Sequence, residues 1–124
     1  MAGEQAPVVI VEDELDVLDV LREALEYEGY RVMPFTHPDQ VHATAAAIDP
    51  AAFLIDIMLP RLSGIELAEA LRRERFPRTP MIALSASALM LDLARQSGLF
   101  NDCIAKPFDI EELVRTLGRL SQKV

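Results

Sequence analysis

Five short apolar segments alternate along the chain with five longer segments whose apolar residues recur at helical spacing. Apolar runs of this length, rich in β-branched residues, predict strands that are buried on both faces. The segments between them are long enough to form helical crossovers, so we predict an α/β fold with a parallel sheet. The predicted strands cover residues 8–11, 30–35, 52–56, 81–85 and 103–106.

The expected strand order follows from the handedness of the crossovers and from one proline. Right-handed crossovers leave few topologies for five strands, and order 2-1-3-4-5 is one of them. This order places the second strand at an edge of the sheet, which suits it because Pro34 lies within it and cannot donate a backbone hydrogen bond. We therefore predict a five-stranded parallel sheet of order 2-1-3-4-5 in a flavodoxin-like three-layer sandwich.

The helical segments carry start and stop signals. Ser63 and Glu66 have the spacing of a capping box at the start of the third helix, and Gly29 and Gly98 follow the first and fourth helices. The predicted helices cover residues 14–28, 38–48, 63 onward, 89–97 and 110 onward.

Four of the five predicted strands end in polar or charged side chains. Because the carboxyl ends of parallel strands share one edge of a sheet, we expect these side chains to meet in one pocket, where ligands of such sheets bind. The residues are Glu12 and Asp13, Asp56, Ser85 and Lys106.

The charges of this pocket predict a magnesium site. Three clustered carboxylates repel one another unless they are protonated or bridged by a cation. Ligands that are all oxygen atoms favour Mg²⁺, which would bring the three carboxylates and Lys106 to neutrality. With Ser85 as a hydroxyl donor, these are the groups that phosphoryl transfer to a carboxylate such as Asp56 requires.

Composition excludes several classes of protein. The 124 residues predict one domain, and the net charge of −8 argues against a direct partner that is nucleic acid or an anionic membrane. The longest apolar run, residues 51–55, is too short to span a bilayer, and no export signal opens the chain. A cytoplasmic protein is therefore expected. The single cysteine, Cys103, allows neither an intrachain disulfide nor a cysteine-based zinc site.

Several motifs, each at the end of a predicted strand, make the chain resemble a receiver domain of the two-component response-regulator family. The resemblance covers residues 8–120, and it rests on the conjunction of the motifs because each one alone is weak. In chain order they are Glu12-Asp13, Asp56-Ile57-Met58-Leu59-Pro60 with Gly64, Ser85-Ala86 and Lys106-Pro107-Phe108.

The resemblance implies that Asp56 accepts a phosphoryl group from a phosphohistidine on a histidine kinase or a histidine phosphotransferase. It implies Mg²⁺ held by Asp13, Asp56 and the backbone carbonyl of Met58, with Glu12 helping through water. Ser85 and Lys106 would contact the phosphoryl oxygens, and the peptide bond before Pro107 would be cis. Such a domain is a phosphoacceptor that assists its own phosphorylation and dephosphorylation, and is not an enzyme acting on another substrate.

Two features depart from the family pattern. The position three residues before Lys106 usually carries an aromatic residue whose rotation couples the pocket to the surface, and here it is Cys103. The fourth helix is unusually apolar, and its apolar residues cannot all face one core. Some of them are expected to contact an output partner or a second copy through the surface of the fourth helix, fifth strand and fifth helix, the alternative being a deeper core contact. These residues are Leu89, Met90, Leu91 and Leu93.

Other interpretations remain open at this point. A phosphohydrolase of this type would carry a second aspartate where Met58 stands, and a flavodoxin-like electron carrier would not place Glu12-Asp13 where a phosphate must bind. The main alternative is an interaction module with the receiver fold that works without phosphorylation. In purely structural interpretations Glu12-Asp13 caps a helix, Ser85 is a turn hydroxyl and Lys106 is a solvated strand end.

Residues 1–124 are predicted to be a single receiver domain with no output domain, either a single-domain regulator or a fragment.

Overall fold

Strands and helices alternate strictly in the computed structural model, which describes residues 6–45, 47–59 and 62–121. The strands are β1 (Val8–Val11), β2 (Val32–Phe35), β3 (Ala52–Asp56), β4 (Met81–Ser85) and β5 (Asp102–Ala105). The helices are α1 (Leu15–Tyr27), α2 (Pro38–Ala45), α3 (Gly64–Glu74), α4 (Ala88–Ser97) and α5 (Ile110–Ser121). All strand pairs are parallel and the order is β2-β1-β3-β4-β5, so the predicted fold and strand order are confirmed.

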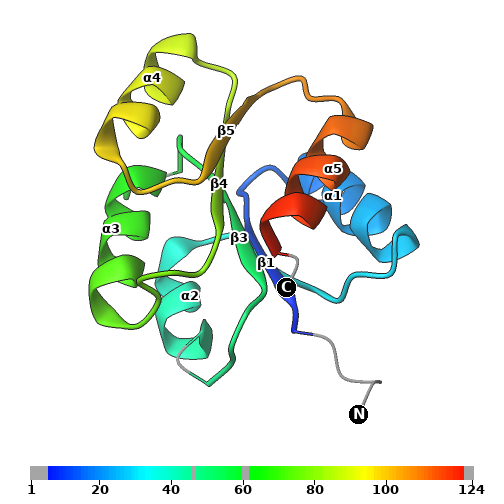
Figure 1. Cartoon of the computed structure of the whole chain (residues 1–124), viewed down its shortest axis with the longest axis horizontal. Helices are drawn as coiled ribbons and strands as arrows, with labels where there is room; N and C mark the ends of the chain where they lie inside the picture. Colours follow the sequence, from blue (N-terminus) through cyan, green and yellow to red (C-terminus); the bar gives the residue numbers. More distant parts are fainter. Residues whose placement is uncertain (1–5, 46, 60–61, 122–124) are drawn as a thin grey trace.

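The sheet is the middle layer of three. Helices α1 and α5 lie on one face, and α2, α3 and α4 lie on the other (Figure 1). Successive side chains of a strand point to opposite faces, so Val8 and Ile10 pack toward α1 and α5, whereas Val9 and Val11 pack toward α2 and α3. Strands β1, β3 and β4 are buried throughout, which explains their continuous apolar sequences. Each fully buried large apolar side chain contributes about 1.5–3 kcal/mol to stability.

Strand β2 forms an edge of the sheet, as Pro34 predicted. The carbonyl oxygens of Arg31 and Phe35 accept hydrogen bonds from Val8 and Glu12 of the β1 segment, at 2.8 and 3.0 Å. Backbone groups of a strand alternate in direction, so the backbone of Pro34 points away from β1 and its missing N–H costs no bond in the sheet.

Several element boundaries differ from the sequence prediction, most of them by a single residue. The second strand begins at Val32, not at residue 30, because the Tyr30 N–H bonds to the Leu25 carbonyl in the turn that ends α1, where Gly29 has a φ of 96°. Helix α2 ends at Ala45, so it does not reach residue 48. Strand β5 ends at Ala105, which places Lys106 one residue beyond it.

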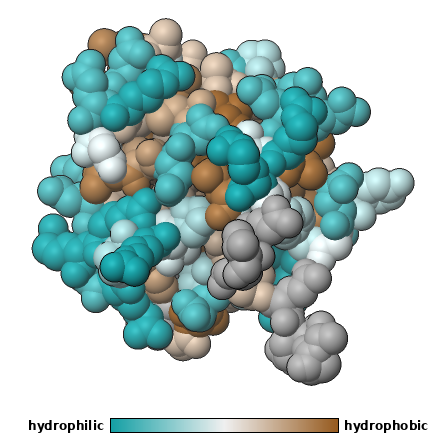
Figure 2. Space-filling view, viewed as in Figure 1, coloured by the Kyte–Doolittle hydropathy of each residue, from teal (hydrophilic) through white to brown (hydrophobic). Residues whose placement is uncertain are grey.

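Apolar side chains are concentrated inside the molecule. Hydrophilic side chains cover much of the face drawn in Figure 2, and apolar ones show between them. Within the described part of the chain, the large apolar residues that stay exposed fall mainly on two helices. They are Leu15, Val20 and Tyr27 on α1, Leu89 and Leu93 on α4, and Met58 after β3.

The exposure of α4 agrees with its sequence. Leu91 is buried, Met90 is half-buried, and Leu89 and Leu93 are 69% and 43% exposed, so the apolar residues wrap around the helix. The alternative of a deeper core contact does not hold for Leu89 and Leu93. None of the described helices has the length and apolar character needed to cross a bilayer.

Candidate functional site

The polar residues that end the strands meet at one edge of the sheet. In the register of the sheet, Asp56 on β3 lies beside Leu84 on β4, and Ser85 lies beside Ala105 on β5. The backbone N–H of Lys106 donates to the Ser85 carbonyl at 2.9 Å, which holds the lysine next to the end of β4. Segments that are up to 94 residues apart in the sequence therefore share one pocket, as the parallel topology predicted.

Lys106 is the centre of the pocket's ion pairs. Its Nζ donates to Glu12 Oε1 at 2.7 Å and to Asp56 Oδ2 at 3.2 Å, and Glu14 Oε1 lies at 3.9 Å. The side chains of Glu12 and Asp56 are 0% and 6% exposed, and that of Lys106 is 14% exposed. The purely structural interpretation of Lys106 as a solvated strand end is therefore wrong.

Burial sets the protonation behaviour of this group. Burial of the carboxyl raises the pKa of Glu12 from 4.5 to about 7, with Lys106 opposing the rise and Asp56 adding to it. Burial alone would lower the pKa of Lys106, but the hydrogen bond to Glu12 and the negative charge of Asp56 outweigh burial and leave that pKa raised. Lys106 is thus held in its charged form. Its single positive charge does not balance the negative charges of the carboxylates around it.

The carboxylates fit a hard cation. One oxygen each from Glu12, Asp13 and Asp56 can lie within 4.8 Å of the other two, and Asp13 is exposed to solvent. Carboxylate oxygens in this number suit Mg²⁺, which keeps several waters and needs few protein ligands. The Met58 N–H donates to Asp56 Oδ1 at 3.0 Å, so the loop after β3 folds back onto the aspartate. The role expected for the Met58 carbonyl stays a prediction, and Pro60 of the same motif lies outside the described residues.

Gly64 allows the next helix to approach the site closely. Its N–H donates to the Ile57 carbonyl at 2.8 Å, and an added Cβ would meet the backbone of Asp56 and Ile57. The capping box predicted at Ser63 and Glu66 is present, with reciprocal bonds of 3.1 and 3.2 Å. The first residue of helix α3 is therefore packed directly against the end of β3 that carries Asp56.

Ser85 connects the pocket to α4. It is fully buried, and its hydroxyl oxygen accepts a hydrogen bond from the Ser87 N–H at 3.1 Å. The Ser87 hydroxyl in turn caps α4 by accepting from the Met90 N–H at 3.2 Å. Cys103 is half-buried beneath α4 with Ala83 and Ala94 of the same apolar cluster. A small side chain thus occupies the position three residues before Lys106, where the family pattern has an aromatic residue.

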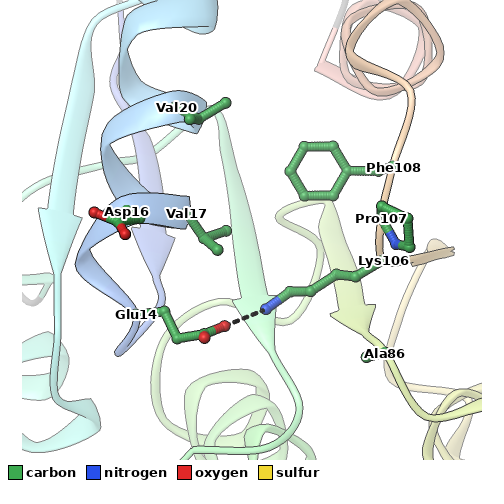
Figure 3. Close-up of a pocket in the computed structure, with 8 residues that line it drawn as sticks. All are labelled: Glu14, Asp16, Val17, Val20, Ala86, Lys106, Pro107 and Phe108. Carbon is green, nitrogen blue, oxygen red and sulfur yellow. Dashed lines mark ion pairs between the residues drawn. The ribbon is translucent and has the colours of Figure 1, made fainter.

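A groove of about 510 Å³ opens beside Lys106, between α1 and the turn after β5 (Figure 3). Val17 and Val20 of α1 lie on one side and Phe108 on the other, while Glu14 reaches Lys106 from the α1 side. The peptide bond between Lys106 and Pro107 is cis, as predicted. The residues that line the groove are Glu14, Asp16, Val17, Val20, Ala86, Lys106, Pro107 and Phe108.

Sequence reasoning missed three features of this site. It assigned Glu12 to the metal and did not anticipate that this carboxylate is also the closest partner of Lys106. It also overlooked Glu14 and the apolar groove. The acidic run Glu12-Asp13-Glu14 was the available signal for Glu14, but the groove depends on residues from both ends of the chain.

Comparisons with known proteins agree with this geometry. The family model for the response regulator receiver domain matches residues 8–118. Among curated proteins, the transcriptional regulatory protein YkoG of Bacillus subtilis is 40% identical over 114 residues, which cover 90% of this chain and 49% of that protein. The phosphate regulon transcriptional regulatory protein PhoB of Pseudomonas aeruginosa is 36% identical over 114 residues, which cover 89% of this chain and 49% of that protein. The chain therefore spans about half the length of these curated relatives.

Solved structures of receiver domains also match nearly the whole chain. The receiver domain of the sensor histidine kinase PA1611 of Pseudomonas aeruginosa PAO1 has a TM-score of 0.85 and 35% identity, covering 95% of this chain and 98% of that one. That structure has a magnesium ion coordinated in its active-site cleft. The receiver domain of NtrX from Brucella abortus has a TM-score of 0.86 and 25% identity, covering 94% of this chain and 99% of that one.

Proposed function

The chain belongs to the response regulator receiver domain family, and on that premise we propose that Asp56 accepts a phosphoryl group from a phosphohistidine on a partner protein. The observation that carries this proposal is the setting of the Asp56 carboxylate. Asp56 ends β3, and its side chain is 6% exposed, lies 3.2 Å from the Lys106 ammonium and belongs to a cluster of three carboxylates. A rigid, nearly dry position between one cation and a candidate cation site is what a carboxylate nucleophile requires.

The transfer needs no other covalent chemistry from the protein. A carboxylate oxygen of Asp56 forms a bond to phosphorus while the phosphorus–nitrogen bond of the phosphohistidine breaks, and the imidazole nitrogen keeps the electron pair. Lys106 moves from Asp56 toward the incoming phosphoryl oxygens, and the Ser85 hydroxyl donates to another of them. The same groups would assist the later loss of the phosphoryl group to water.

Glu12, Asp13, Asp56 and the Met58 carbonyl would hold Mg²⁺ at this site. The bound ion supplies positive charge against the phosphoryl oxygens and against the carboxylate cluster. The magnesium coordinated in the PA1611 receiver supports this assignment for the present chain.

The partner that supplies the phosphoryl group docks on the groove beside Lys106. Val17, Val20 and Phe108 offer an apolar surface there, and Leu15 and Val20 of α1 are exposed. Residues 12–28 carry eight acidic residues and one arginine, a net charge of −7 out of −8 for the chain. We expect a histidine kinase or histidine phosphotransferase whose docking face is apolar at its centre and basic at its rim, with association that weakens as salt rises.

The output of phosphorylation is read at α4, β5 and α5, where Leu89 and Leu93 are exposed. These residues suit contact with an output protein or with a second copy of the chain. The interaction module that works without phosphorylation is not favoured, because the acceptor, the lysine and the carboxylate cluster are all assembled in one pocket.

Phosphorylation of the whole chain by acetyl phosphate with Mg²⁺, followed by intact-mass measurement, tests the proposal. Wild type should gain one phosphoryl group, and Asp56→Asn should gain none while keeping its circular dichroism spectrum. Asp92→Asn on the exposed surface of α4 removes the same charge and should label normally. Undiminished labelling of Asp56→Asn contradicts the assignment.

A further inference from the structure

Glu14 carries a negative charge that has no part in the phosphoryl transfer proposed for Asp56. It is the N-cap residue of α1, and its backbone is held on both sides. The Glu14 N–H donates to Glu12 Oε2 at 3.2 Å, and the Glu14 carbonyl accepts from the Leu18 N–H at 3.0 Å. The N-cap side chain of a helix commonly accepts a hydrogen bond from the first turn, but within the described residues the Glu14 carboxylate does not. The carboxylate is therefore held in place by its backbone and is not used to cap α1.

The carboxylate of Glu14 lies at the rim of the phosphorylation pocket. Figure 3 shows it reaching from the start of α1 toward Lys106, and its Oε1 lies 3.9 Å from the Lys106 Nζ. The Glu14 side chain is exposed, whereas that of Glu12, which bonds the same lysine, is buried. Glu14 does not belong to the described cluster of three carboxylates that could hold a cation. A cation bound by that cluster would therefore leave the Glu14 carboxylate uncoordinated.

The groove beside Glu14 has acidic residues at its mouth and apolar walls. Of the described residues that line it, Glu14 and Asp16 are acidic and Lys106 is the one cation. The Lys106 ammonium is already bonded to Glu12 and Asp56, so it does not neutralise the two acidic groups at the mouth. The groove therefore favours a group with an apolar body and a positive charge. Its apolar walls are Val17, Val20, Ala86, Pro107 and Phe108.

The leaving group of a phosphoryl donor has to lie near this mouth. In-line transfer places the leaving group on the far side of phosphorus from the attacking Asp56 oxygen. Because the Asp56 side chain is buried and that of Glu14 is exposed, the far side is the solvent side, where Glu14 lies. The Glu14 carboxylate is therefore near the atoms whose charge changes as the bond to phosphorus breaks.

We propose that Glu14 is a specificity-determining residue, which favours phosphoryl donors with a positively charged leaving group and disfavours acyl phosphates. The proposal rests on the function proposed for Asp56. In the protonated form of a phosphoimidazole the ring is positive. When its phosphorus–nitrogen bond breaks, that nitrogen keeps the electron pair, the other nitrogen keeps its proton, and neutral imidazole leaves. In an acyl phosphate the phosphorus–oxygen bond breaks, and the departing carboxylate gains a negative charge.

The Glu14 carboxylate acts on these two leaving groups with opposite sign. It attracts the imidazolium ring and repels the developing carboxylate. The phosphoryl oxygens are common to both donors, so their repulsion by Glu14 cancels when the two rate constants are compared as a ratio. For unit charges several ångströms apart at a partly exposed rim, the expected change in this ratio is about threefold to tenfold.

Second-order rate constants for phosphorylation by two small donors test the proposal. The donors are acetyl phosphate and 1-phosphoimidazole, each mixed with the whole chain at saturating Mg²⁺, and intact mass follows the gain of the phosphoryl group. Glu14→Gln should raise the ratio of the acetyl phosphate rate constant to the phosphoimidazole rate constant about threefold to tenfold. Glu14→Lys reverses the charge and should raise this ratio further.

A matched variant and a salt series separate a local effect of Glu14 from a change in net charge. Glu23→Gln removes the same charge from the exposed surface farther along α1, and should leave both rate constants as in wild type. The difference between wild type and Glu14→Gln should shrink as ionic strength rises from about 10 mM to about 1 M, because exposed charges are screened. If Glu14→Gln changes both rate constants by the same factor, Glu14 does not act on the leaving group and the proposal is refuted.

The same measurements separate this proposal from the function proposed for Asp56. A wild-type chain that gains a phosphoryl group from neither donor refutes the function of Asp56, and the role of Glu14 with it. Labelling by both donors, with the same ratio of rate constants in wild type, Glu14→Gln and Glu14→Lys, refutes the role of Glu14 alone.

Discussion

The buried carboxyl of Glu12 should make the metal-free protein less stable at neutral pH than at mildly acidic pH. Its pKa is about 7 in the folded chain, against an ordinary value of 4.5. A group whose pKa is raised by folding stabilises the fold below its unfolded pKa, and this stabilisation is lost as the pH rises through the folded pKa. The window of loss therefore runs from about pH 4.5 to about pH 7.

The size of the effect follows from the same two pKa values. At about 1.4 kcal/mol per pH unit, the gap between 4.5 and about 7 corresponds to about 3 kcal/mol. Solvent screening does not reduce this figure strongly, because the Glu12 side chain is 0% exposed. The raised pKa of Lys106 adds no pH dependence to the unfolding free energy in this window. The stability that Lys106 contributes is lost only as the pH rises through its own, more alkaline pKa.

Urea unfolding of wild type and Glu12→Gln, followed by far-ultraviolet circular dichroism in the presence of a chelator, measures the effect. The chain has no tryptophan, so circular dichroism is the better signal. The neutral amide resembles the protonated carboxyl, so the unfolding free energy of Glu12→Gln relative to wild type should rise by about 3 kcal/mol from pH 4.5 to pH 8. Saturating Mg²⁺ should flatten the wild-type profile, because a bound cation favours the charged carboxylate.

Glu14→Gln is the matched control. It removes the same charge beside the same lysine, but its side chain is 67% exposed, so no burial cost is relieved. A free-energy difference between wild type and Glu12→Gln that stays constant from pH 4.5 to pH 8 refutes the reasoning. An equal slope in Glu14→Gln refutes it too, since burial would then not be the cause.

Four further predictions concern the metal, the output and the packing of the site. Asp13→Asn should weaken Mg²⁺ binding at least tenfold by calorimetry, because it removes one of three clustered carboxylates. Ser85→Ala should still be phosphorylated by acetyl phosphate but should lose most of the phosphorylation-dependent change at the Ser87 amide, measured by NMR. Leu89→Ser should weaken any self-association seen by sedimentation in both phosphorylation states, because it removes exposed apolar surface without touching the pocket. Gly64→Ala should lower the unfolding free energy by about 1–3 kcal/mol, because the added Cβ meets the backbone of Asp56 and Ile57; an unchanged urea midpoint would contradict this contact.

The sequence predicted the fold and most of the pocket because both depend on topology. Right-handed crossovers and the position of Pro34 gave the strand order, and parallel strands bring their carboxyl ends to one edge. The grouping of Asp56, Ser85 and Lys106 follows from that order alone, without knowledge of any side-chain contact. The cis peptide before Pro107 came from the family resemblance.

The partners of individual side chains could not be predicted in the same way. Glu12, Asp13 and Asp56 are all candidate partners of Lys106 by topology, and only the bond geometry shows that Glu12 is closest, at 2.7 Å. The contacts of Arg72 are harder still. Its guanidinium donates to the carbonyls of Phe76, Thr79 and Leu99 and to Asn101 Oδ1, so three of the four acceptors are backbone carbonyls, which every residue has. A sequence carries no signal for such acceptors.

The proline of β2 has a consequence for how the protein behaves at high concentration. An open sheet edge offers its unpaired N–H and C=O groups to any passing strand, and this is a common start of aggregation. Because the Pro34 backbone points outward, the centre of that edge has a carbonyl but no N–H, so a regular ladder with another chain cannot form there. Leu89 and Leu93, which we propose for contacts with a partner, are therefore exposed on a domain whose β2 edge resists such irregular pairing with another chain.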